Sequence, residues 1–145
     1  AATYRLTSPQ SADAGSRFRV RATTGAGSVL SREAVLSVTP NLAPTATITA
    51  PDASLRYAGA MTIAFAGTAV DPEDGPLAPA AFTWRVDFHH DTHAHPFVPA
   101  TAGIAAGSFV VPVVGETSAN VWYRLILTVA DSRGRTHTTV RDVHP

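Results

Sequence analysis

The sequence predicts an all-β protein built as an antiparallel β-sandwich. Three observations carry this prediction: apolar and polar residues alternate over short runs, prolines and glycines interrupt any helical pattern, and turn residues recur about every eight to twelve positions. The chain has 145 residues, of which 45% are hydrophobic, so it is long enough to build a core in one or two small domains.

Runs of alternating or apolar residues mark the expected strands in chain order. In most of these runs every second side chain is apolar and the others are polar, as in a strand with one buried face. The first run is backed by arginines, and the later runs carry the large aromatic residues. The apolar positions are Phe18, Val20 and Ala22; Val35, Leu36 and Val38; Ile63, Phe65, Gly67 and Ala69; Phe82, Trp84, Val86 and Phe88; and Tyr123, Leu125, Leu127 and Val129.

A proline-bracketed segment divides the chain. Residues 40–44 begin and end with proline, which cannot donate a backbone hydrogen bond to a sheet, so we expect a linker there. Residues 45–145 then have the usual size of a complete sandwich. Residues 1–39 can supply only a few strands, and an isolated hairpin is marginally stable in water. We therefore expect an incomplete sandwich, then a linker, then a complete sandwich.

Charge and composition exclude several classes of function. Eleven basic residues balance eleven acidic ones, so the chain has no excess positive charge with which to bind nucleic acid. The sequence contains no apolar run of about eighteen residues, the length that would span a membrane. It contains no cysteine, which excludes a disulfide framework, thiol catalysis and thiolate zinc sites.

Residues 1–39 carry a pattern of aspartate, glycine and aromatic residues followed by a glycine-containing hairpin. Asp13 and Gly15 precede Phe18 and Val20, and the hairpin covers residues 24–28. This pattern resembles the last third of an immunoglobulin-like domain, with Phe18 in the place of the usual tyrosine and Val20 in that of the usual cysteine. The resemblance implies that the chain begins inside a domain, whose missing strands belong to the preceding polypeptide or to a neighbouring chain.

The second block carries motifs of a bacterial surface module. Residues 41–48, 66–75 and 127–134 resemble the repeats of the polycystic-kidney-disease type (PKD-like) of secreted and surface proteins. The string from Phe88 to Phe97, after Trp84, is similar to the C-terminal module of secreted glucose/sorbosone-dehydrogenase-like enzymes, which carry pyrroloquinoline quinone. The resemblance implies a secreted or cell-surface bacterial protein. Its quinone-binding domain would be separate from this segment, so we expect no organic cofactor here.

Four histidines and an aspartate gather within residues 89–95. Imidazole is the commonest metal ligand at neutral pH. His93 and His95 are two positions apart, so on an extended strand they share a face, with their Cα atoms about 6.6–7 Å apart. With a turn at Asp91, His90 could fold back as a third ligand of zinc or copper. The expected topology brings Glu116 to the same end of the sandwich. The predicted metal site therefore comprises His89, His90, Asp91, His93, His95 and Glu116.

A second interpretation of the histidine string stays open. His90 continues the inward face of the strand that carries Phe88, so the imidazoles could form a structural network that hydrogen-bonds backbone carbonyls. A carbohydrate-binding surface is a third interpretation.

Carboxylates gather in two other loops, which we expect at the opposite end of the sandwich. Asp71, Glu73, Asp74 and Asp131 could hold calcium through oxygen ligands. The competing interpretation is turn chemistry, in which aspartates accept backbone hydrogen bonds without an ion. We favour turn chemistry.

Patterns of catalytic residues are missing from the sequence. It has no Gly-x-Ser-x-Gly elbow, and its glycine pair at residues 25–27 is not followed by a helix that would bind phosphate.

Trp122 precedes the inward Tyr123, so its indole could point outward and stack on a sugar ring. We therefore expect a non-catalytic accessory or binding module that contacts other domains of the same polypeptide. The alternatives are a filament or adhesin subunit completed by a neighbouring chain, and a carbohydrate-targeting module.

Overall fold

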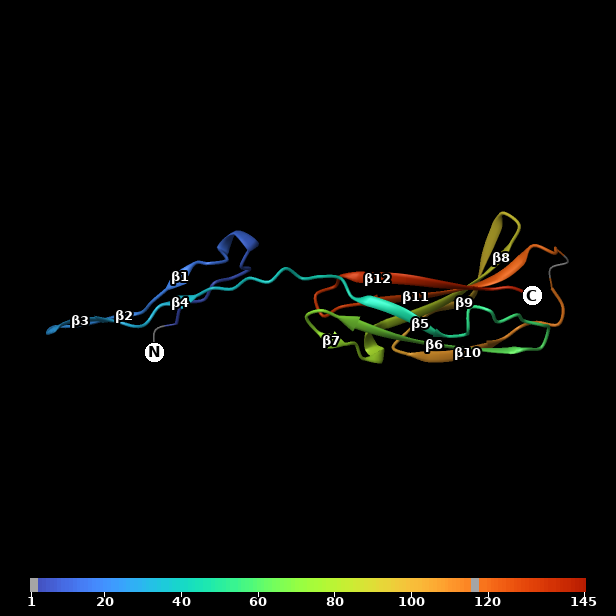
Figure 1. Cartoon of the computed structure of the whole chain (residues 1–145), viewed down its shortest axis with the longest axis horizontal. Coiled ribbons are helices and arrows are strands. Elements are labelled where there is room, and N and C mark those ends of the chain that lie inside the picture. The colour runs from blue at the N-terminus through green and yellow to red at the C-terminus, as the bar shows by residue number, and fades with distance from the viewer. Residues whose placement is uncertain (1–2, 116–117) are drawn as a thin grey trace. The chain divides into compact units, whose positions relative to one another are not determined.

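The computed structural model describes residues 3–115 and 118–145. Its chain divides into two units, Ala1–Pro40 (unit 1) and Asn41–Pro145 (unit 2), each with its own strands (Figure 1). Strands account for almost all of the regular structure, with two short 3-10 turns in the described residues, so the predicted all-β class is confirmed.

Unit 1 consists of narrow two-stranded ribbons. After the 3-10 turn η1 (Ser11–Asp13), β1 (Arg17–Phe18) pairs with β4 (Ala34–Val35), and β2 (Arg21–Thr24) pairs with β3 (Gly27–Leu30). The expected buried face of this segment is not observed. The strand breaks between β1 and β2, and Phe18 and Val20 are 37% and 66% exposed, because no second sheet covers them within the described part of unit 1.

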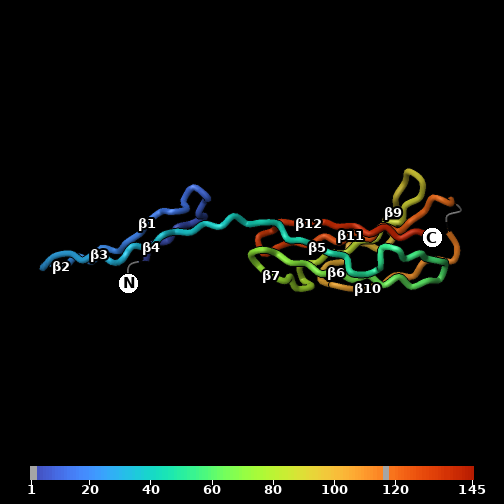
Figure 2. Tube along the Cα trace, in the orientation of Figure 1, coloured from blue at the N-terminus to red at the C-terminus, as the bar shows by residue number. Residues whose placement is uncertain are grey.

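Unit 2 is a sandwich of two antiparallel sheets over its described residues. One sheet has the order β10-β6-β5 with β7 beside β6, and the other has the order β12-β11-β8-β9. Figure 2 follows the chain between them. The elements are β5 (Thr45–Ala50), β6 (Thr62–Asp71), β7 (Gly75–Pro76), η2 (Pro79–Ala81), β8 (Phe82–His90), β9 (His93–Ala102), β10 (Ala106–Val110), β11 (Val121–Ala130) and β12 (Thr136–Val143).

The predicted alternation sets the core of unit 2. Ile63 and Phe65 point inward from β6, and Leu125 and Leu127 point inward from β11, all essentially buried. Trp84 on β8 is 1% exposed, and its ring centroid lies 4.7 Å from that of Phe65 across the two sheets. The sandwich core therefore forms entirely from residues of unit 2.

Candidate functional site

The hairpin of β8 and β9 carries the histidine string. Its two-residue turn is Asp91–Thr92, and Asp91 has a φ of 47°, as a tight hairpin turn requires. The Asp91 N–H donates to the Asn120 carbonyl (3.0 Å), and the Asp91 carboxylate accepts from the Ser118 hydroxyl (3.1 Å). Figures 1 and 2 show this turn standing away from the two sheets. The hairpin tip is therefore fastened to the segment that precedes β11.

Strand register divides the four histidines between two faces. His93 lies opposite His90, and His95 lies opposite Phe88, so these three imidazoles share the face that continues the core side of β8. His89, the intervening residue, lies on the other face of the sheet. The sequence string is thus a group of three and a single histidine.

His90 and His95 meet nitrogen to nitrogen. Their Nε2 atoms are 2.9 Å apart, their ring planes differ by 13°, and their centroids are 5.1 Å apart. The centroid separation exceeds the nitrogen separation by about one ring diameter, so the rings lie end to end and not face to face. This is the geometry of an N–H···N hydrogen bond, in which one Nε2 carries the proton and the other accepts it.

His93 lies beside this pair without joining it. Its ring centroid is 5.5 Å from that of His90, and its Nδ1 is 3.4 Å from the Thr92 hydroxyl. Across residues 3–115 and 118–145, no group of three or more histidine, aspartate or glutamate side chains is arranged to hold a metal ion. Glu116, the carboxylate predicted to complete the site, lies outside the described residues. What the structure brings together is a pair of imidazoles.

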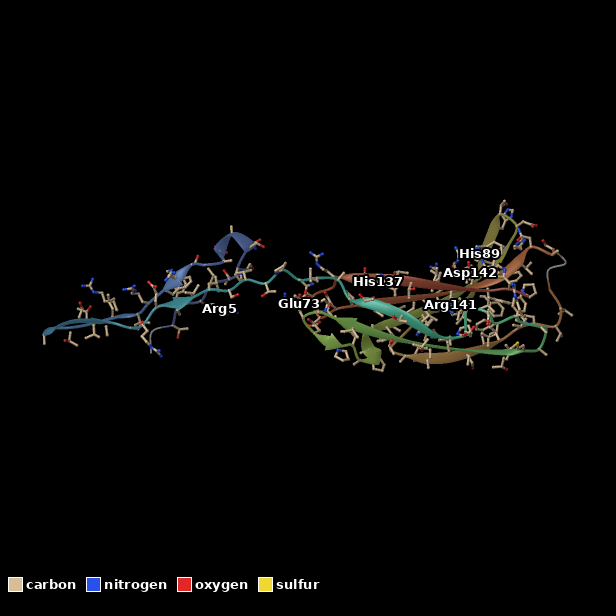
Figure 3. The ribbon with its side chains drawn as sticks, viewed as in Figure 1. Arg5, Glu73, His89, His137, Arg141 and Asp142 are labelled. Carbon is tan, nitrogen blue, oxygen red and sulfur yellow. The ribbon has the colours of Figure 1, made fainter. Side chains whose placement is uncertain are left out.

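The outer face of the same sheet carries an aromatic row that the sequence did not reveal as a unit. We define it as His89, Trp122 and His144, which lie on the neighbouring strands β8 and β11 and just after β12. The Trp122 centroid lies 4.7 Å from that of His89 and 6.0 Å from that of His144, with nearly parallel planes. Figure 3 shows His89 near Asp142 on this sheet. Alternation combined with strand register would have found the row.

The row bears on the expected sugar contact of Trp122. A sugar stacks on the face of an indole, and His89 and His144 lie on opposite sides of this indole. Trp122 Nε1 and His89 Nε2 are buried without a hydrogen-bond partner among the described residues. A sugar would therefore have to displace one of the two imidazoles before it could stack.

The carboxylates of the predicted calcium loops organise backbone turns. Asp71 Oδ1 accepts the N–H groups of Glu73 (2.9 Å) and Asp74 (2.8 Å), and the Asp74 carboxylate accepts the N–H and hydroxyl of Ser132. The Glu73 carboxylate accepts the Leu42 N–H. The two loops therefore lie together, with Asp71 Oδ2 buried and without a partner among the described residues.

Asp131 anchors the same end of the sandwich. It accepts the Asn41 side-chain amide (2.6 Å) and the N–H groups of Arg133 and Arg135 (2.8 Å each). Burial raises the pKa of this carboxyl, but the hydrogen bonds from Asn41 and from the backbone outweigh it and hold the pKa below the usual value. Its oxygens are thus already engaged by the protein.

A cavity lies between the two sheets of unit 2, beside β8 and β9, the two strands of the histidine hairpin. It has a volume of about 370 Å³, and its aromatic lining comes from Tyr57, Phe88, Phe97 and Tyr123. Burial raises the pKa of Tyr57 and, together with the nearby Tyr57, that of Tyr123. Both hydroxyls therefore stay protonated at neutral pH.

Comparison of the chain with protein-family models, curated proteins and solved structures gives no match. Within the described residues, no helix is long and apolar enough to cross a bilayer.

Proposed function

We propose that the chain is a non-catalytic accessory module of a secreted, multidomain bacterial protein. In this proposal unit 2 is a rigid carrier, and unit 1 is the part that packs against other polypeptide. The observation that carries the proposal is the contrast between the two units in where their apolar side chains lie. The resemblance to PKD-like and dehydrogenase-associated modules supports the cellular setting.

Unit 1 presents apolar side chains to solvent. Tyr4, Val20 and Val29 are 75%, 66% and 73% exposed, and a groove of about 660 Å³ runs past Tyr4, Phe18 and Leu36. Exposed apolar patches of this kind mark surfaces that bind other proteins, and the edges of short ribbons can pair with a further strand. A strand from the rest of the same polypeptide is the occupant we propose, and one from a neighbouring chain would make the module a filament or adhesin segment.

Unit 2 supports the non-catalytic part of the proposal through the roles of its polar groups. The loop carboxylates accept backbone N–H groups, and His137 Nδ1 accepts the Ala46 N–H (3.0 Å), which ties the edges of the two sheets together. Arg124 and Asp142 pair with each other. These groups are engaged in holding the sandwich together.

Binding of the dye ANS, which fluoresces on exposed apolar surface, tests the proposal. The whole chain should bind ANS, residues 41–145 alone should bind much less, and the double variant Val20→Ser/Val29→Ser should fall between them. The whole chain and residues 41–145 alone should show the same main thermal transition by circular dichroism, because the core belongs to unit 2. Equal ANS binding by these two proteins, or failure of residues 41–145 to fold, would contradict the proposed division of roles.

A further inference from the structure

The geometry points to a binding site for a monovalent copper ion, Cu(I), between His90 and His95. The two imidazoles would be its ligands in a linear, two-coordinate arrangement. The site involves unit 2 only, so it is independent of the docking role proposed for unit 1.

The direction of the nitrogen lone pairs selects this ion. Because the rings of His90 and His95 lie end to end and nearly coplanar, the in-plane bonding directions of their Nε2 atoms point at each other along one line. In the hydrogen-bonded pair one of these directions holds an N–H bond and the other a lone pair. A tetrahedral zinc ion needs four ligands converging on one point, and Cu(II) prefers four ligands in a square. The opposed imidazoles supply two ligands on opposite sides, which is the complete coordination of a linear Cu(I) ion.

The ion requires a small separation of the two rings. With metal–nitrogen bonds of about 2 Å, the two nitrogens must lie about 4 Å apart, so they must move about 1 Å further from each other. His95 is exposed on the outer strand of the hairpin, which allows its side chain to turn. The hydrogen-bonded pair is then the metal-free form of the site.

Proton balance is preserved when the ion enters a neutral pair. The imidazole that donates the hydrogen bond carries its proton on Nε2, and this proton moves to Nδ1 of the same ring. Both Nε2 atoms then offer a lone pair to the ion, and the site gains its single positive charge. The 145-residue chain contains no cysteine, so none of its own side chains is a thiolate that competes for Cu(I).

Anaerobic titration of the whole chain with Cu(I), in competition with the chelator bicinchoninate, tests the site. The expected result is one ion per chain, with the copper-edge X-ray absorption spectrum of two nitrogen ligands in a line. Removing a residue that only hydrogen-bonds a metal ligand typically lowers metal affinity 10–100-fold. His95→Phe removes a ligand itself, so it should weaken Cu(I) binding by more than that. Its thermal unfolding shows whether the fold is intact.

Two matched variants serve as controls. His93→Phe changes the neighbouring imidazole on the same face, and His144→Phe changes one on the opposite face; both should leave the Cu(I) affinity unchanged. The inference is overturned if His95→Phe binds Cu(I) as tightly as the natural chain. A spectrum of three or four ligands, or stoichiometric zinc binding that excludes Cu(I), would also overturn it.

Discussion

Arg124 and Asp142 form a two-pronged ion pair across the neighbouring strands β11 and β12. The guanidinium donates from Nε to Oδ1 and from Nη2 to Oδ2, each over 2.7 Å. These hydrogen bonds from Arg124 lower the pKa of Asp142; burial opposes the effect, and the positive charges of Arg124, His144 and His89 add to it. Planar, paired geometry of this kind is stronger than that of most surface ion pairs.

The first prediction concerns the pH dependence of stability. Because the pKa of Asp142 is lower in the folded state, the pair stabilises the protein above the unfolded pKa of about 3.9 and loses this effect as the pH falls through the folded value. Asp142→Asn should therefore lower the free energy of unfolding at pH 7 by about 1 kcal/mol, a value kept small because both side chains are about one third exposed.

Urea unfolding at pH 7 and at a pH below the folded pKa measures this effect. The difference between the natural chain and Asp142→Asn should shrink towards zero in acid. Asp87→Asn is the comparison variant, since Asp87 accepts from Arg85 through a single guanidinium nitrogen and acts on Arg124 through its charge alone. An equal loss for Asp142→Asn at both pH values would show that the charge of the carboxylate is not what stabilises the fold.

Alternation predicted the sandwich core because the inward face of a strand repeats every two residues. Trp84 and Leu125 are buried as this period requires. The same rule failed for Phe18 and Val20, because burial also needs a covering sheet, which a pattern within one strand does not reveal.

The histidine pair shows a second limit of sequence reasoning. The spacing of His93 and His95 correctly placed both on one face of β9. The contact of His90 with His95 depends instead on the register between two strands and on the rotation of each ring. Neither can be deduced from spacing, and together they decide which ion could bind.

Gly67 is the subject of the second prediction. A Cβ atom there would lie 2.6 Å from Leu127 Cδ2 and 3.0 Å from both the Thr47 carbonyl oxygen and Trp84 Cζ2. Gly67→Ala should therefore overpack the core and lower the free energy of unfolding by about 2 kcal/mol, as measured in urea. At Gly115 a Cβ would meet no atom of the described residues within 4 Å, so Gly115→Ala is the control. Similar stability of both variants would mean that the two sheets move apart to admit the added methyl group without lowering the free energy of unfolding.

The third prediction is that calcium leaves the stability of unit 2 unchanged. The carboxylates of Asp71, Asp74 and Asp131 accept N–H groups of the protein, and an ion would have to compete with these donors. The melting temperature should be the same with a chelator and with millimolar calcium. A calcium-dependent rise that Asp71→Asn removes would show instead that the partnerless Asp71 Oδ2 is a ligand.

The fourth prediction is a large difference in hydrogen exchange between the two units. The backbone of β11 is paired on both sides, with β8 and β12, and its inward side chains are buried. Its amides should exchange only through extensive unfolding. The β2–β3 ribbon pairs on one side only, and all of its residues are exposed, so its amides should exchange at the earliest times.

Mass spectrometry after deuterium labelling measures both segments in one sample. Residues 41–145 alone serve as the control, in which β11 should keep its protection because its partners all lie in unit 2. Labelling at two protein concentrations separates folding within one chain from association between chains. If β2–β3 is protected only at the higher concentration, a second copy of the chain covers the apolar side chains of unit 1. If it is protected at both, the protection arises within one chain, and the expected fast exchange of this ribbon is contradicted.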